Sequence, residues 1–146
     1  RVIKNDGILV VAVPNIESLQ AKMGGKKWFH LDAPRHLYHF SPETLGNMLE
    51  RNGFKVEKIN HFSFVYNFVG VIQTLLNIIG IKFNFLHHLI KRVDRQKSYF
   101  NFEFVYNFLL TFLFGAIFFL PAVVFSLFES LIGKGATITL YAKKTS

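Results

Sequence analysis

The sequence predicts a mixed α/β chain whose sheet is interrupted by a long hydrophobic helical insertion. Three observations indicate this fold class: strand patterns near both ends of the chain, a helix with clear start and stop signals between the first two strands, and two uncharged segments at 62–81 and 104–128. Strands that alternate with a helix are typical of α/β domains. We therefore expect residues 1–61 and the closing strand at 136–146 to build one sheet around the insertion at 62–135.

The first predicted strand is the apolar run at residues 8–13, which ends at Pro14 and Asn15. A continuous run of β-branched and aliphatic residues indicates a parallel strand that is buried on both faces. Residues 16–40 mix a short helical pattern with Gly24-Gly25 and a polar, aromatic stretch. We interpret this part as a structured loop that leaves the end of the strand.

A helix is predicted to start at Ser41, because serine can cap a helix, Pro42 suits the first helical position and Glu43 complements the helix dipole. Asn52 and Gly53 supply the stop signal. A second strand follows at 54–61. The last strand, at 137–143, alternates apolar and polar residues before the basic tail.

The insertion is predicted to be membrane-associated. Each uncharged segment is long enough to cross a hydrocarbon core of about 30 Å as a helix. If the flanking strands pair in one sheet, the chain must leave and return on the same side of the bilayer. Two crossings would translocate the basic connector at 82–97, which the positive-inside tendency disfavours, and Pro121 interrupts the second segment. We therefore expect a monotopic insertion; the alternatives are a two-span hairpin and a buried helical core.

The charge and composition of the sequence limit the classes of partner that the chain can bind. The net charge is +8, and 18 of the 146 residues are Phe. The basic connector lies between the two uncharged segments, so the positive charge predicts anionic lipids at a membrane surface rather than nucleic acid. The absence of cysteine from the sequence excludes disulfides, thiolate nucleophiles and Cys-ligated metals within these residues.

The candidate site follows the first strand. In open α/β sheets, ligands bind beyond the carboxyl ends of the strands, so a loop that leaves the first strand is well placed. Histidine can remove a proton from an acceptor, which makes His36 and His39 the candidate catalytic residues, and Arg35 could hold an anionic group.

Other interpretations of these residues stay open. His36 and His39 could equally be hydrogen-bonded structural residues. For His30 and Asp32, a structural role is the preferred interpretation. A zinc or iron site built from these four side chains matches no specific ligand spacing. The sequence has no Gly-rich phosphate loop, no G-x-G-x-x-G after a strand and no G-x-S-x-G turn, so we predict no cofactor-binding or metal-binding residues in this chain.

Two segments carry a resemblance to a known family. Residues 2–15 resemble the "L-K-P-G-G, strand, P-N" segment that opens the second half of class I S-adenosylmethionine-dependent methyltransferases. Residues 28–54, with Pro34-Arg35-His36-Leu37 and His39-Phe40-Ser41, resemble the bacterial branch of that superfamily found in polysaccharide and lipid biosynthesis clusters. The resemblance covers about residues 1–61, and 136–144 fit the closing strand of the family.

The resemblance implies that this chain is the C-terminal half of a Rossmann-like methyltransferase sheet. Residues 8–13 would be the fifth strand, 42–52 the next helix, 55–61 the sixth strand and 137–143 the antiparallel seventh. The implied cofactor is S-adenosylmethionine, bound mainly by a missing N-terminal half, so the chain alone is expected to be inactive. The implied substrate-binding residues are Asn15, Trp28, Arg35 and Tyr38, with proton removal by His36 or His39.

The expected function is methyl transfer to a small-molecule or lipid-linked acceptor at the cytoplasmic face of the inner membrane. The alternatives are a non-enzymatic membrane-binding module and a small metal-dependent hydrolase. A sheet cut in half would leave an unpaired edge and an apolar face at residues 8–13, which predicts poor solubility or self-association.

Overall fold

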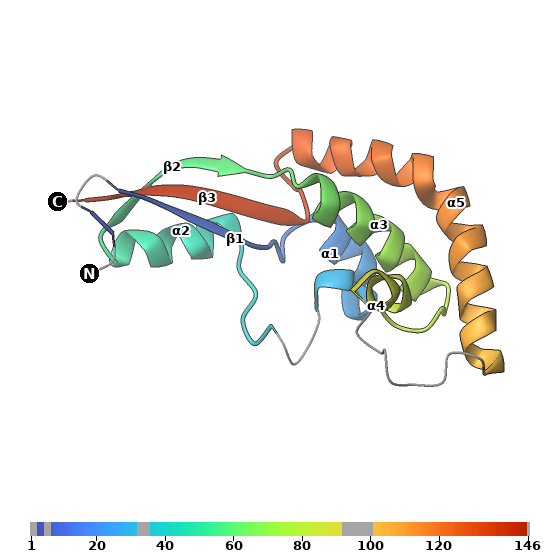
Figure 1. The fold of residues 1–146 in the computed structure, drawn as a ribbon. Coiled ribbons are helices and arrows are strands. Elements are labelled where there is room, and N and C mark those ends of the chain that lie inside the picture. The colour runs from blue at the N-terminus through green and yellow to red at the C-terminus, as the bar shows by residue number, and fades with distance from the viewer. Residues whose placement is uncertain (1–2, 5–6, 32–35, 92–100, 146) are drawn as a thin grey trace.

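The computed structural model describes residues 3–4, 7–31, 36–91 and 101–145 (Figure 1). Its elements are β1 (Ile8–Pro14), α1 (Leu19–Gly24), the 3-10 turns η1 (Gly25–Lys27) and η2 (Phe29–Leu31), α2 (Pro42–Arg51), β2 (Phe54–Asn60), α3 (Phe64–Ile78), α4 (Phe85–Lys91), α5 (Phe102–Leu131) and β3 (Thr137–Lys144). The sheet and α2 form one end of the molecule. The helices α1, α3 and α4 lie in the middle, and α5 runs along the outside (Figure 1).

The sheet has three strands in the order β1-β3-β2, and β3 is antiparallel to both neighbours. Leu140 in β3 pairs with Val11 on one side and with Ile59 on the other. The chain is therefore mixed α/β, as predicted, and the closing strand is antiparallel. All adjacent strands in the described sheet are antiparallel, however, which is not the parallel pairing of a Rossmann-like sheet.

The prediction that β1 is buried on both faces is wrong for the described chain. Ile8 and Val10 are 61% and 53% exposed, whereas Leu9, Val11 and Val13 pack against the core. The reason is that α2 covers one face of the sheet and β1 lies at its edge. The expected unpaired edge and exposed apolar face of this strand are confirmed.

The core beneath the sheet is built by α2. Leu45 and Leu49 are buried against Ile138, Leu140 and Ala142 of β3. The predicted helix start is confirmed, because the Thr44 backbone N–H donates to Ser41 Oγ at 3.1 Å. In return, the Ser41 N–H donates to Thr44 Oγ1 at 2.8 Å, which completes a capping box.

The first half of the insertion forms a short helix with two different sides. The 15 residues of α3 extend about 22 Å, less than a hydrocarbon core of about 30 Å. On one side, Val71, Ile72 and Leu76 pack with Ala122 of α5. The opposite side carries the buried polar residues Gln73, Thr74 and Asn77. The two-span hairpin is therefore not supported, because α3 is too short and is covered by protein.

The second half of the insertion is α5, a helix of 30 residues and the one helix among the described residues that is long and apolar enough to cross a membrane. We expected Pro121 to break this segment, but the helix continues through it. Figure 1 shows instead that α5 changes direction along its length, as a helix does when proline removes a backbone hydrogen bond. Within its most apolar part, 11% of the residues are buried by the described residues, so this chain by itself does not enclose α5 in a core.

Candidate functional site

The predicted site loop returns to the carboxyl end of β1. The Ile16 N–H donates to the Phe40 carbonyl oxygen at 3.0 Å, and Asn15 forms a single parallel bridge with Phe40. Phe40 therefore lies beside the end of this strand, and the loop residues 36–39 lead into it. Arg35, predicted to bind an anionic group, lies outside the described residues.

Asn15 is a structural residue in this geometry. Its side chain is fully buried, its Nδ2 donates to the Gly135 carbonyl oxygen at 3.0 Å, and its Oδ1 accepts from the Glu17 N–H at 3.1 Å. The Nδ2 end of the amide joins the end of β1 to the segment that precedes β3, and the Oδ1 end holds the local turn after β1. Substrate binding by Asn15 therefore gains no support from the structure.

Three predicted site residues gather at one place. The Trp28 and His39 ring centroids are 6.2 Å apart, and those of His36 and His39 are 6.4 Å apart. Trp28 is buried, His39 is half-buried and His36 is exposed, so the group runs from the interior to the surface. Tyr38 is 78% exposed and projects from the loop.

Two nitrogen atoms of this group are buried without a hydrogen bond. Trp28 Nε1 and His39 Nδ1 have no partner within the described part of the chain. The indole nitrogen can only donate, whereas a neutral imidazole nitrogen can accept. A hydroxyl could therefore accept from Trp28 and give its proton to His39 if it contacted both atoms.

His30 has a structural environment. It is 7% exposed, its Nε2 lies 3.2 Å from the Tyr66 carbonyl oxygen, and its ring packs against those of Trp28 and Phe29. The proposed four-residue metal site includes Asp32, which lies outside the described residues. Among the residues that are described, no three His, Asp or Glu side chains gather as a metal site would require.

A polar junction that the sequence analysis missed joins the insertion to the sheet. Glu129 of α5 is fully buried, and its Oε1 accepts from Gln20 Nε2 at 2.6 Å and from the Ala136 N–H at 3.3 Å. Gln20 Nε2 also donates to the Asn67 carbonyl oxygen at 2.9 Å. We call Glu129, Gln20, Asn67 and Ala136 the Glu129 junction; they tie together α5, α1, α3 and the start of β3.

Burial dominates the electrostatics of this junction. Desolvation raises the pKa of Glu129 from 4.5 to about 7, although the hydrogen bonds from Gln20 and Ala136 oppose the shift. Nearby, desolvation lowers the pKa of His61, and the positive charge of Lys134 adds to this effect. The sequence signal was Glu129 itself, the first charged residue after an uncharged segment.

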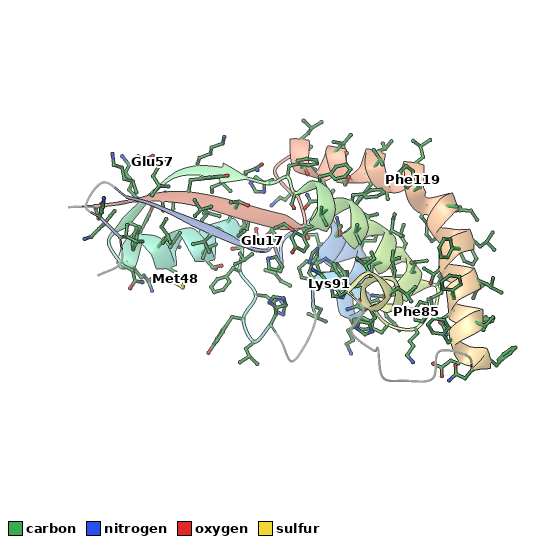
Figure 2. The ribbon with its side chains drawn as sticks, in the orientation of Figure 1. Glu17, Met48, Glu57, Phe85, Lys91 and Phe119 are labelled. Carbon is green, nitrogen blue, oxygen red and sulfur yellow. The ribbon has the colours of Figure 1, made fainter. Side chains whose placement is uncertain are left out.

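The outer surface of α5 is apolar along its whole length. Figure 2 shows these side chains pointing away from the rest of the molecule, with Phe119 labelled. We call this surface the outer face of α5; its exposed members from Val105 onward are Val105, Tyr106, Phe108, Leu109, Phe112, Leu113, Ile117, Phe119, Leu120, Val124, Leu127, Phe128 and Leu131. The buried residues of α5 are Asn107, Thr111, Ala122, Ser126 and Glu129, and four of these five are polar.

Comparison with known proteins does not assign the site. The chain matches no protein-family model and no curated protein. A surface pocket on α2, lined by Thr44, Asn47, Met48, Arg51 and Asn52, contains none of the predicted site residues. The two features of the molecule that bear on its function are therefore the loop at the end of β1 and the outer face of α5.

Proposed function

We propose that this chain is the C-terminal part of a class I S-adenosylmethionine-dependent methyltransferase that modifies a membrane-proximal or lipid-linked acceptor at the cytoplasmic face of the membrane. The observation that carries the proposal is that the loop with His36 and His39 meets the carboxyl end of β1 at Phe40, while His39 lies against Trp28. Binding loops of open α/β sheets occupy this position.

The connections between the strands support the proposal. Because β1 and β2 are both antiparallel to β3, they run in the same direction, and α2 connects them along one face of the sheet. This is a β-α-β unit with an antiparallel strand inserted between its two strands. Such a unit is compatible with fifth and sixth strands separated by an antiparallel seventh, as the resemblance implies.

The exposed side of β1 also supports the proposal. Its free edge and the exposed Ile8 and Val10 are unusual for a strand with apolar residues on both faces. The half of the enzyme that holds the cofactor would supply a further strand to pair with this edge and a helix to cover Ile8 and Val10. S-adenosylmethionine would supply the methyl group, and no residue of this chain is assigned to hold it.

The residues of this chain would prepare the acceptor. His39, whose Nδ1 is buried without a hydrogen bond in the described chain, would take the proton of an acceptor hydroxyl, and Trp28 Nε1 would orient the oxygen. His36 lies at the exposed side of the pair, where it can pass the proton to solvent. Tyr38 and Arg35 remain predicted substrate contacts.

The test is calorimetric titration of S-adenosylmethionine into the product of the whole gene, including any coding sequence upstream of Arg1. We expect saturable binding that survives His39→Ala, because His39 is assigned to the acceptor. Methyl transfer to a membrane extract should fall at least about a hundredfold in the same variant, which is typical for loss of a general base. Absence of cofactor binding by the intact protein would contradict the proposal.

A second function is favoured by a separate observation. The outer face of α5 favours a non-enzymatic module that would hold a partner at the bilayer. The same titration separates the two functions, because a module of this kind binds vesicles but not S-adenosylmethionine.

A further inference from the structure

The distribution of polar and apolar residues on α5 is inverted relative to a helix on a water-soluble protein. Asn107, Thr111 and Ser126 face the protein and are at most 6% exposed. Leu113, Leu120 and Val124 face outward and are 56–68% exposed. Apolar area in water is unfavourable in proportion to its extent, so this arrangement suits a helix whose outer side meets a hydrocarbon environment.

The apolar surface is broader than one helix partner would cover. At about 100° per residue, the exposed positions from Val105 to Leu131 spread over about 200° of the helix circumference. The surface also continues onto the first turn of α3, because Phe119 packs on Phe68 and Phe68 stacks on Phe64, which is 68% exposed. A packed helix needs a stripe of about 100°, whereas lipid adapts to any width.

Both ends of α5 are tied to the same short helix and its turn. Near the end of α5, Asn67 Nδ2 of α3 donates to Ser130 Oγ at 3.0 Å. Near its start, Asn107 Oδ1 accepts from the Lys82 N–H, just after α3, at 2.8 Å. Neither end of α5 can therefore move far from α3.

The polar side of α3 is in turn tied to the segment between α1 and α2. Thr74 Oγ1 accepts from the Phe29 N–H at 3.1 Å, and Asn77 Nδ2 donates to the Lys27 carbonyl oxygen at 2.9 Å. A bilayer-spanning α5 would place one of its ends, and with it this part of the α/β region, across the membrane. The sheet cannot follow, because β2 enters the insertion and β3 leaves it as paired neighbours.

We infer that α5 lies in the plane of the membrane, with its outer face inserted into one leaflet and both of its ends on the side of the sheet. The occupant of the apolar surface is therefore lipid, and the net charge of +8 favours anionic headgroups. This inference deepens the membrane part of the proposed function and rests on it, but it is independent of methyl transfer.

These 146 residues contain no cysteine, so a single-cysteine variant of this chain reports on one position. Glu103→Cys and Lys134→Cys mark the two ends of α5, and Glu57→Cys, on an exposed part of β2, marks the sheet (Figure 2). The protein is reconstituted into sealed vesicles of phosphatidylcholine and phosphatidylglycerol and treated with a membrane-impermeant maleimide. We expect the same fraction of protein to be labelled at all three positions, whether the protein faces the inside or the outside of the vesicles.

A depth measurement completes the test. A bimane label on Leu113→Cys should shift to shorter wavelength when vesicles are added, whereas the label on Glu57→Cys should not. Leu120→Lys should weaken partitioning about tenfold or more, since burial of one leucine contributes that much. The matched control Ile59→Lys, which changes a partly exposed residue of β2, should leave partitioning unchanged.

Three results would overturn the inference. Protection of either end of α5 while Glu57→Cys is labelled would mean that the helix crosses the bilayer. A Leu113 label that does not respond to vesicles, together with a defined oligomer in detergent, would make a second copy the occupant. No vesicle binding at all would remove the inference and the proposed localisation together, whereas S-adenosylmethionine binding by the whole gene product would still support methyl transfer.

Discussion

The two helices α2 and α5 bury opposite kinds of residue. In α2, the buried residues are Leu45 and Leu49, while Glu43, Glu50 and Arg51 are exposed. In α5, the buried residues are mostly polar, and the exposed ones from Val105 onward are apolar or aromatic. Because both helices belong to one chain, this difference is what the proposed membrane location predicts: water around the sheet, and lipid around the outer face of α5.

The greatest loss of stability is expected from a substitution at Gly135, where the segment before β3 touches the end of β2. Gly135 lies so close to the His61 carbonyl oxygen that an added Cβ would overlap it. We therefore expect Gly135→Ala to lower the free energy of unfolding by about 3 kcal/mol or more. Urea unfolding in mild detergent, followed by the fluorescence of Trp28, the one tryptophan in the sequence, measures this change.

The control for that substitution is Gly115→Ala in α5, where an added Cβ would meet no atom within 4 Å. Alanine favours helix more than glycine does, so this variant should be unchanged or up to about 1 kcal/mol more stable. Equal losses in the two variants would mean that the close approach at Gly135 does not hold the regions together.

Leucine-to-alanine changes in the two regions sharpen the comparison. Leu140 is fully buried beneath α2, and its truncation should lower the free energy of unfolding by about 3 kcal/mol. Leu120 is 68% exposed, so Leu120→Ala should change the same free energy in detergent by less than about 0.5 kcal/mol. A large loss at Leu120 would indicate that α5 packs against protein instead.

The Glu129 junction predicts a pH dependence. The folded-state pKa of about 7 lies above the ordinary value of 4.5, so the folded protein binds the proton more tightly than the unfolded chain. The free energy of unfolding should therefore fall as the pH rises from about 4.5 to about 7, by about 3 kcal/mol, and stay level above. Denaturant titrations at several pH values measure the slope.

Glu129→Gln should remove that slope, because glutamine keeps the size of the side chain and does not titrate. The remaining dependence would come from His61, whose lowered pKa has the opposite sign: it makes the protein more stable as the pH rises towards 6.5. If the free energy of unfolding of this variant still falls with rising pH as in the wild type, a group other than Glu129 binds the proton responsible.

The smallest predicted effect concerns helix starts. Ser41 caps α2 through its side chain, whereas Ser63, at the start of α3, makes no side-chain cap. Ser41→Ala should lower the free energy of unfolding by about 1 kcal/mol, and Ser63→Ala by less than about 0.5 kcal/mol. Equal effects would indicate that the two starts are held by packing alone.

The sequence predicted the elements better than their partners. Strands at 54–61 and 137–143 and the helix that begins after Ser41 are local patterns, and each is found close to its expected position. The pairing of β1 depends on β3, more than a hundred residues away, and no local pattern contains that information. The identity of the strand that pairs with β1 was therefore learned only from the structure.

For the candidate site, too, the sequence predicted some features and missed others. The gathering of Trp28, His36 and His39 follows from their position after a strand, but the burial of Asn15 depends on Gly135, far along the chain. Likewise, the polar residues of α3 and α5 lie in segments that are apolar on average. Only their three-dimensional neighbours reveal that they face protein while the apolar residues face outward.

Flotation on a density gradient with vesicles of phosphatidylcholine and phosphatidylglycerol tests most directly whether the insertion meets lipid. The wild-type chain should rise with the vesicles, and a variant with lysine at both Leu113 and Leu120 should stay in the dense fraction while keeping the far-ultraviolet circular dichroism of the wild type. If the wild type stays behind, or if the double variant floats equally well, the outer face of α5 is not a membrane surface.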